Sequence, residues 1–313
     1  MPDQEKLYDV AIVGYGPAGV TAGIYVARRR LMAVLIGETP GGEVASSGEI
    51  ENWPGDGETG GMELTRKFEE HLKIHEDQVD IVTHERVSKI RKVDDGFFAL
   101  KMEDEKEYRA KTVIYAAGRH PRELNVPGER KFKGKGVSYC AVCDAPLFAD
   151  RRVAVIGGGN TGVEAAIMLQ KIASRIYLLH IGETLSADQV LVDSVKDDDK
   201  VEIIYNARTT KIGGDGLVTS LSYQDEKTGR EGRLEVAGIF VSIGAVPNTD
   251  PIKDLIEMDK HGAVVTDRYG KTSVEGFFAA GDVTDIRDAQ IVVAAGHGCS
   301  AALSAGDYLA RKA

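Results

Sequence analysis

Cysteine is scarce in this sequence, with three residues among 313, at positions 140, 143 and 299. That is too few for the disulfide framework that holds small secreted domains together, so the fold depends on an ordinary hydrophobic core. In a reducing compartment, two cysteines separated by two residues are more often catalytic or metal-binding than structural. The scarcity therefore directs attention to the pair Cys140 and Cys143.

Positive charge is also in deficit, and long apolar runs are missing. The chain has 39 Lys and Arg residues against 49 Asp and Glu residues, a formal net charge of -10. Nucleic acids and anionic lipids repel such a protein, so we expect neither as a partner. No run approaches the roughly 18 apolar residues that span a bilayer, and the first residues lack the pattern of a signal peptide. We therefore expect no membrane segment and a cytoplasmic protein.

Glycine is abundant, and part of it belongs to an internal repeat. The strand-like segment Leu7–Val13 leads into residues 14–19, GYGPAG, and the segment Arg152–Ile156 leads into residues 157–162, GGGNTG. A helical stretch and a second strand follow in both cases. This order is typical of the βαβ unit that binds a dinucleotide. The repeat predicts two such units, and the chain is long enough for two domains.

The breaks between the predicted elements indicate how these units are connected. Residues 118–121 and 244–248 combine Gly and Pro, which interrupt regular structure. We therefore predict an α/β fold of two doubly wound, Rossmann-like domains, with the second inserted into the first. The first domain would comprise residues 1–118 and 246–313, and the inserted domain residues 119–245.

The first glycine motif has a physical explanation at each position. Gly14 allows a tight turn, Gly16 lets backbone N–H groups approach a pyrophosphate, and Gly19 lets the helix pack close to the strand. The helix N-terminus then stabilises the phosphate charge. Glu38 lies about 20 residues further on, where an acid can bind the adenosine ribose. A simple glycine-rich turn is the alternative.

The sharpest chemical signal is the sequence CAVCD at residues 140–144. Cys140 and Cys143 can close a small disulfide ring and exchange two electrons at a time. Asp144 can move a proton to or from a thiol. Half of a zinc site, completed by His297 and Cys299, is one alternative, although zinc usually takes four ligands. A buried, inert pair is the other, and we predict no metal.

Together these motifs resemble the low-molecular-weight thioredoxin reductases over nearly the whole chain. The resemblance rests on residues 14–19, 51–55 (ENWPG), 139–144 (YCAVCD), 157–162 and 279–283 (AAGDV). It implies a flavoprotein that passes two electrons from a donor, through FAD and the cysteine pair, to thioredoxin. It also implies a homodimer.

The resemblance assigns roles to individual residues. Cys143 is similar to the thiol nearest the flavin, Cys140 to the thiol that attacks the partner's disulfide, and Asp144 to the acid of the family. Asp282 would bind the ribityl chain. The residues placed around FAD are Gly14, Gly16, Pro17, Ala18, Gly19, Glu38, Gly42, Asn52, Gly118, Gly281, Asp282 and Gln290. Those assigned to a second nucleotide are Gly157, Gly159, Asn160, Thr161, Gly162 and Glu183.

The sequence departs from the family where the electron donor is chosen. The family usually carries arginines that bind the 2′-phosphate of NADPH, but the matching residues 180–186, HIGETLS, contain none. Glu183 would repel a phosphate and accept from a free ribose hydroxyl. Ala289 stands where an arginine is usual before Gln290, and Glu43 where a glutamine often follows the paired glycines. The chain therefore resembles the divergent branch of the family that has lost its preference for NADPH. Members of that branch accept NADH, reduced F420 or ferredoxin, or have no known donor.

Three functions fit these observations. The leading one is an FAD-dependent thioredoxin-disulfide reductase. A related flavin-dependent dithiol or disulfide oxidoreductase would act on another partner, such as a peroxiredoxin. A redox sensor that binds a nucleotide or zinc without catalysis is the third, and a purified protein containing FAD and no zinc would argue against it.

Overall fold

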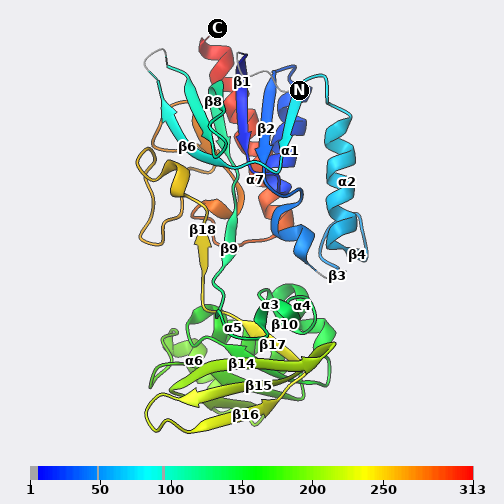
Figure 1. Ribbon diagram of the computed structural model, residues 1–313, viewed down its shortest axis with the longest axis vertical. Coiled ribbons are helices and arrows are strands. Elements are labelled where there is room, and N and C mark those ends of the chain that lie inside the picture. Colours follow the sequence, from blue (N-terminus) through cyan, green and yellow to red (C-terminus); the bar gives the residue numbers. More distant parts are fainter. Residues whose placement is uncertain (1–5, 48, 94–95, 313) are drawn as a thin grey trace. The chain divides into compact units, whose positions relative to one another are not determined.

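The computed structural model describes residues 6–47, 49–93 and 96–312. The chain divides into two compact units (Figure 1). Unit 1 comprises Met1–His120 and Val246–Ala313, and unit 2 comprises Pro121–Ala245. Both are built on a sheet with a parallel core and helices, so the prediction of two doubly wound α/β units, one inserted into the other, is confirmed.

Unit 1 is organised around a seven-stranded sheet. The strands, in spatial order, are β5 (Val79–Thr83), β2 (Ala33–Gly37), β1 (Leu7–Val13), β8 (Glu107–Tyr115), β7 (Phe98–Met102) and β6 (Val87–Lys92), and β19 (Phe277–Ala279) pairs with β8. β1 pairs in parallel with β2 and β8, while β7 is antiparallel to its neighbours. All five residues of β2 are buried, as in a parallel strand that is covered on both faces.

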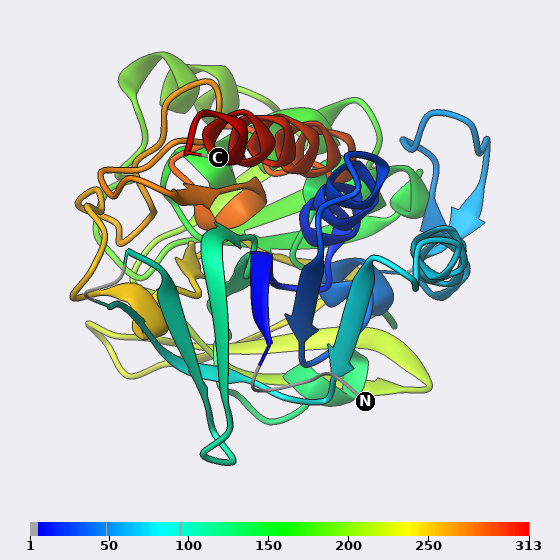
Figure 2. The same cartoon turned by 90° about the horizontal axis from the view of Figure 1, so that it is seen from above.

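Helices and short elements complete unit 1. They are α1 (Pro17–Arg28), α2 (Gly61–Lys73), α7 (Ile291–Lys312), the 3₁₀ turns η1 (Gly42–Ser46), η3 (Asp250–Ile252) and η4 (Gly281–Val283), and the hairpin of β3 (Glu49–Ile50) and β4 (Thr59–Gly60). α1 and α7 lie side by side (Figure 2). They pack closely because Gly298 has no side chain: a Cβ there would lie 2.0 Å from the carbonyl oxygen of Ala18.

Unit 2 has a five-stranded parallel sheet and a three-stranded antiparallel sheet. The first, in order, contains β10 (Val137–Ser138), β17 (Gly238–Val241), β11 (Arg152–Ile156), β12 (Arg175–Leu179) and β13 (Val201–Ile204); the second contains β14 (Ala207–Asp215), β15 (Leu217–Asp225) and β16 (Glu231–Glu235). The helical elements are α3 (Glu129–Phe132), α4 (Ala141–Asp144), η2 (Ala145–Phe148), α5 (Asn160–Gln170) and α6 (Gln189–Lys196).

The chain passes between the units twice, through β9 (Arg119–Pro121) and β18 (Ala245–Pro247). These strands pair with each other as a separate two-stranded sheet (Figure 1). Within the described ranges, we find no helix that combines the length and the apolar character needed to cross a lipid bilayer.

Candidate functional site

The turn between β1 and α1 requires glycine at two positions. Gly14 has φ of 119°, a left-handed conformation that favours glycine, and a Cβ there would lie 2.1 Å from the carbonyl oxygen of Ala116. A Cβ on Gly19 would lie 1.9 Å from the carbonyl oxygen of Gly14. Both contacts are with backbone atoms, which cannot move aside cheaply. Gly14 and Gly19 therefore serve the fold of the turn itself.

Gly16 differs, because the protein leaves it room for a side chain. The nearest atom to a Cβ there would be the carbonyl oxygen of Gly41, at an ordinary contact distance of 3.8 Å. Its φ of −83° suits any residue. Packing within the described chain therefore does not require glycine at this position, whereas a ligand pressed against the backbone does.

The start of α1 suits an anion. Pro17 occupies the first helical turn, no described side chain caps the helix, and Ala18 is buried behind the turn. The unpaired N–H groups and the positive end of the helix dipole favour a phosphate at this position. Gly42, with φ of 57°, lies opposite, since a Cβ on it would be 3.6 Å from Cα of Gly16.

Two predicted cofactor residues from distant parts of the chain come together in unit 1. The side-chain amide of Asn52 donates to Oε1 of Gln290 over 3.3 Å, although 238 residues separate them. Gln290 directly precedes α7, and its carbonyl oxygen accepts the N–H of Ala294. The pair therefore joins the segment after η1 to the start of α7.

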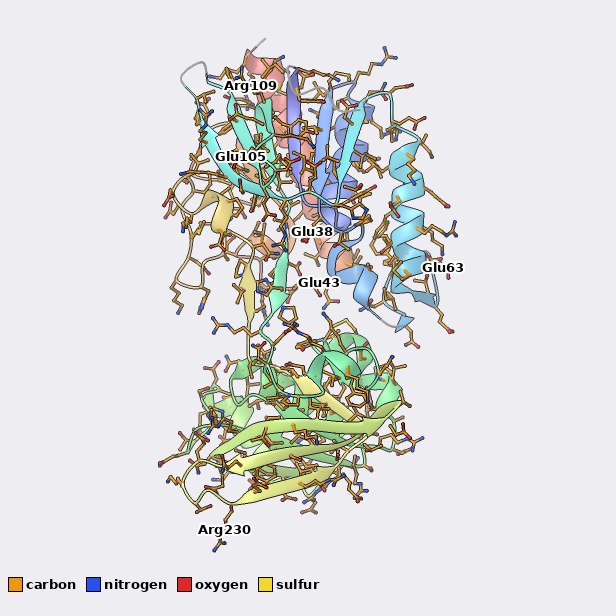
Figure 3. All side chains as sticks on the ribbon, in the orientation of Figure 1. Glu38, Glu43, Glu63, Glu105, Arg109 and Arg230 are labelled. Carbon is orange, nitrogen blue, oxygen red and sulfur yellow. A yellow bond between two sulfur atoms is a disulfide. The ribbon has the colours of Figure 1, made fainter. Side chains whose placement is uncertain are left out.

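Glu38 follows β2 directly, and its carboxylate forms an ion pair with Arg86. Nε of Arg86 lies 2.6 Å from Oε2 of Glu38, in an exposed ion pair. The second carboxylate oxygen still has lone pairs for a ribose hydroxyl. Glu38 and Glu43 lie toward the same edge of the sheet of unit 1 (Figure 3).

Asp282 lies in η4, which packs on the start of α1. Gly281 has φ of 74°, and a Cβ on it would be 3.0 Å from Cβ of Ala18. Burial raises the pKa of Asp282. The positive charges of Arg119 and His297 oppose this increase, and Glu43 adds to it. Sequence reasoning missed Arg119, whose partner lies far away in the chain.

Gly118 leads directly into Arg119. It has φ of 67°, and its carbonyl oxygen accepts the N–H of Asn248 over 3.0 Å. No described atom lies within 4 Å of a Cβ built on it, so open space surrounds this glycine. Gly118 is thereby held within unit 1, close in sequence to the cation beside Asp282.

The cysteines at 140 and 143 form a disulfide within unit 2. Cys140 precedes α4, and its sulfur accepts the N–H of Cys143 over 3.2 Å. Both residues are only half-buried, and Val142 between them is 53% exposed. This disulfide is therefore partly exposed, unlike one in a closed core.

Ser138, which sequence reasoning also missed, connects the pair to the neighbouring acid. Its hydroxyl oxygen accepts the N–H of Cys140 over 3.1 Å, and the side chain is 5% exposed. The same hydroxyl donates to the carbonyl oxygen of Cys140 over 3.3 Å and also lies within hydrogen-bonding reach of the carboxyl group of Asp144. Burial raises the pKa of Asp144, and this hydrogen bond partly opposes the increase. The carboxyl group therefore keeps its proton to a higher pH than an exposed aspartate.

A buried carboxylate anchors the backbone before the cysteines. Glu129 is 1% exposed and accepts the N–H groups of Leu124 and Asn125 at 2.8 and 2.7 Å. It also accepts the hydroxyl of Tyr139 at 2.8 Å. Burial and this carboxylate raise the pKa of Tyr139, so the phenol keeps its proton. Tyr139 is the residue before Cys140, so the approach to the disulfide is held by a charge-assisted network.

The described part of the chain contains no group of three or more His, Cys, Asp or Glu side chains placed to hold a metal ion. The sulfurs of Cys140 and Cys143 are bonded to each other. Cys299 is half-buried in α7, in the other unit.

The second glycine turn repeats the geometry of the first. Gly157 has φ of 128°, and a Cβ on it would lie 2.1 Å from the carbonyl oxygen of Ser242. A Cβ on Gly162 would lie 1.9 Å from the carbonyl oxygen of Gly157. Gly159 again has room, with Ser186 Oγ nearest at 3.7 Å. Asn160 and Thr161 open α5, which no described side chain caps.

The segment after β12, residues 180–188, lies against this turn. Ser186 donates its N–H to the carbonyl oxygen of Gly158 over 2.8 Å. The amide of Asn160 makes two hydrogen bonds with Asp188, one to its N–H and one to its carboxylate. Burial lowers the pKa of His180, which favours the neutral imidazole. Glu183 forms an ion pair with Lys227, so the structure supplies a cation that the local sequence lacks.

Comparisons with known proteins agree with this arrangement. The family of pyridine nucleotide-disulphide oxidoreductases matches residues 8–298. The chain is 42% identical over 304 residues to an NADH dehydrogenase of Bacillus subtilis (strain 168), covering 97% of this chain and 59% of that protein. It is 43% identical over 314 residues to an alkyl hydroperoxide reductase component of Escherichia coli (strain K12), covering 99% and 60%. The chain thus spans about 60% of the length of these curated relatives.

Solved structures of thioredoxin reductases are similar over nearly their whole length. The enzyme of Streptococcus pyogenes MGAS5005 superposes with a TM-score of 0.91 at 37% identity, covering 97% of this chain and 99% of that one. The enzyme of Giardia duodenalis gives a TM-score of 0.90 at 32% identity, with the same coverage. The resemblance based on the motifs is confirmed. The chain belongs to the pyridine nucleotide-disulphide oxidoreductases, a family that uses FAD together with a nicotinamide nucleotide.

Proposed function

We propose that this protein is an FAD-dependent disulfide reductase that transfers two electrons to the Cys140–Cys143 disulfide and then to the disulfide of a thioredoxin-like protein. One observation carries the proposal. A half-exposed C-x-x-C disulfide, in which Ser138 links the N–H of Cys140 to the half-buried acid Asp144, occurs in a chain that also builds an open phosphate cradle.

The residues of unit 1 fit FAD. Gly16 leaves open the space that a pyrophosphate would take, and the start of α1 favours its charge. Glu38 would bind the adenosine ribose and Asp282 the ribityl hydroxyls. Asn52, Gln290 and Gly118 would lie near the ring system. When bound, FAD supplies the hydride-accepting redox chemistry that protein side chains lack.

The chemistry at the sulfurs uses residues of unit 2. Two electrons and two protons convert the disulfide into two thiols, and Asp144 supplies one of the protons. Cys140 then loses its proton and attacks one sulfur of the partner's disulfide, while the other partner sulfur leaves as a thiolate. The N–H of Cys143 stabilises the negative charge on Cys140. Cys143 then loses its proton and attacks the Cys140 sulfur of the mixed disulfide, which restores the Cys140–Cys143 bond. The two protons given up by the cysteines pass to the two sulfurs of the partner, which leaves as a dithiol.

The proposed electron donor is NADH. The glycines at 157, 159 and 162 form a second open cradle, and residues 180–186 carry no arginine for a 2′-phosphate. The NADH dehydrogenase among the relatives supports this choice. Reduced F420 and reduced ferredoxin are the competing donors.

The proposed partner is a thioredoxin or a similar small protein, as the solved thioredoxin reductases suggest. A second candidate role is electron delivery within a hydroperoxide reductase, favoured by 43% identity to a component of such an enzyme. The sulfur chemistry is the same for both. We also propose a homodimer working in the reducing cytoplasm, where a C-x-x-C pair can cycle.

Anaerobic titration of the purified flavoprotein tests the proposal. NADH, NADPH, reduced F420 and reduced ferredoxin are added in turn, while flavin absorbance and thiol content are followed. We expect NADH to bleach the flavin and then to expose two new thiols. Addition of thioredoxin, or of a peroxiredoxin, should restore the absorbance and identify the partner. A colourless protein, or bleaching without new thiols, contradicts the proposal.

A further inference from the structure

The segment of residues 180–188 lies where a dinucleotide-binding unit contacts the adenosine ribose. In such folds the ribose lies at the carboxyl end of the second strand, here β12, which ends at Leu179. Ser186 and Asp188 hold the segment against the glycine turn through Gly158 and Asn160. We call it the ribose loop, because this position is the one that distinguishes a free 2′-hydroxyl from a 2′-phosphate.

The charges of the ribose loop are both negative. Asp188 is bonded to Asn160 through one carboxylate oxygen. Glu183 is also exposed, and its Oε1 lies 2.8 Å from Nζ of Lys227. Among the ion pairs of the described residues, this is the one that brings a cation to the loop. Lys227 belongs to the turn between β15 and β16, far from the glycine motif in sequence.

Backbone hydrogen bonds hold this turn beside the ribose loop. Asn206 donates its N–H to the carbonyl oxygen of Gly182 over 3.0 Å, and Glu226 donates its N–H to the carbonyl oxygen of Asn206 over 2.8 Å. The carboxylate of Asp225 accepts the N–H groups of Lys227 and Thr228, both over 2.8 Å.

The hydrogen bonds to Asp225, with that to Thr228 the largest cause, lower its pKa, so it remains an acceptor at neutral pH. The position of the backbone of Lys227 is therefore fixed by the turn, whereas its side chain is free to change partner.

We infer that Glu183 and Lys227 together determine whether this site takes a nicotinamide dinucleotide with a free ribose hydroxyl or one with a 2′-phosphate. The inference rests on the proposed function, since it names the donor class for the same enzyme. Glu183 accepts from the hydroxyl and repels a phosphate. Lys227 offsets part of that repulsion, and its ammonium group would form the ion pair with a 2′-phosphate. The two residues thus act in opposite directions on one preference.

Neutralising Glu183 and neutralising Lys227 should shift the preference between NAD⁺ and NADP⁺ in opposite directions. For Glu183→Gln, the ratio of the NADP⁺ dissociation constant to that of NAD⁺ should fall about three- to tenfold, because Lys227 is released for the phosphate. For Lys227→Gln the same ratio should rise by about as much, because Glu183 is no longer offset. Lys227→Arg should behave as the parent protein.

Calorimetric titration of the holoprotein with NAD⁺ and NADP⁺ measures both constants without turnover. Lys211→Gln is the matched control, since Lys211 is an exposed lysine of the same unit in β14, and its ratio should stay within about twofold. The shifts should shrink in high salt, because the pair is exposed.

The inference would be overturned if the ratio of dissociation constants moved in the same direction in Glu183→Gln and Lys227→Gln, or if it did not change in Lys227→Gln. Binding of neither dinucleotide to the parent protein would also overturn it. The proposed disulfide reduction would survive that result if chemically reduced holoprotein still exposed the two thiols.

Discussion

The guanidinium of Arg119 lies beside the carboxylate of Asp282, with 3.8 Å between Nε and Oδ2. Arg119 opposes the burial that raises the pKa of Asp282. In Arg119→Gln that pKa should rise further, so the carboxylate is protonated at a higher pH. If Asp282 binds the ribityl hydroxyls, FAD release on acidification should then begin at a higher pH than in the parent protein.

FAD fluorescence released during dialysis against a series of buffers from acidic to neutral pH measures this shift. Arg91→Gln, which removes an exposed ion pair of unit 1, is the control. Superimposable pH curves for Arg119→Gln and the parent protein would show that Arg119 does not act on Asp282.

The glycines of the first turn should separate stability from cofactor binding. Gly19→Ala places a Cβ against the carbonyl oxygen of Gly14, and should cost the apoprotein about 3 kcal/mol of unfolding free energy. Gly16→Ala meets no described atom closer than 3.8 Å, and should change that free energy by less than about 1 kcal/mol. It should nevertheless weaken FAD binding at least about tenfold, because a methyl group enters the pyrophosphate space. Urea unfolding and FAD titration of the two variants provide the measurements, and normal FAD affinity in Gly16→Ala would contradict the assignment.

Replacing each of the two cysteines should block electron transfer at a different step. Cys143→Ser removes the disulfide that would take electrons from the flavin, so titration should bleach the flavin while the thiol content stays unchanged. Cys140→Ser should leave a thiolate at Cys143, visible as a long-wavelength charge-transfer band, while reduction of the partner is abolished. Anaerobic spectra of both variants make the comparison. Normal turnover of thioredoxin by Cys140→Ser would reverse the assigned roles.

Asp144 should control the pH dependence of disulfide exchange. Because burial raises its pKa, the protonated acid persists to a higher pH than usual, and the rate should fall as the pH rises through that value. Asp144→Asn should slow reduction of the protein's disulfide by about 10²- to 10⁴-fold and remove this alkaline decline. Rapid mixing across the pH range tests both effects. Asp150→Asn suits as the control, since Asn tolerates its positive φ of 57°.

Ser138 should act as a positioning residue. Ser138→Ala removes the hydrogen bond that lowers the pKa of Asp144, so the alkaline decline should move to higher pH instead of disappearing. The half-buried N–H of Cys140 also loses its acceptor, which should cost about 1 kcal/mol of stability. Ser138→Thr should restore the pH profile, a result that a merely destabilising substitution would not give. An unchanged profile in Ser138→Ala would count against this role.

Local spacing explains which features could be predicted. The turns at Gly14 and Gly157 were identifiable because strand, glycines and helix are consecutive in the sequence. The same holds for Cys140 and Cys143, whose separation by two residues suffices for a ring. These local patterns, repeated once, were enough for the α/β fold class.

Contacts set by topology were not predictable in this way. Arg119 meets Asp282, and Lys227 meets Glu183, because separate elements converge in the fold. A lysine in a polar turn has no sequence signature that distinguishes it from a solvated one. Ser138 was within reach of the motif, two residues before Cys140, but a serine at the end of a short strand signals nothing by itself.

The buried carboxylate of Glu129 has a consequence for which partner disulfides can react in the proposed exchange. If Tyr139 or either N–H group withdrew, a buried negative charge would lose a donor, and that is costly. The main chain that enters the Cys140–Cys143 pair is thus stiff. In the proposed exchange, shape adjustment therefore falls to the incoming protein, so partners with a protruding, pliable disulfide should react faster than those whose disulfide is recessed.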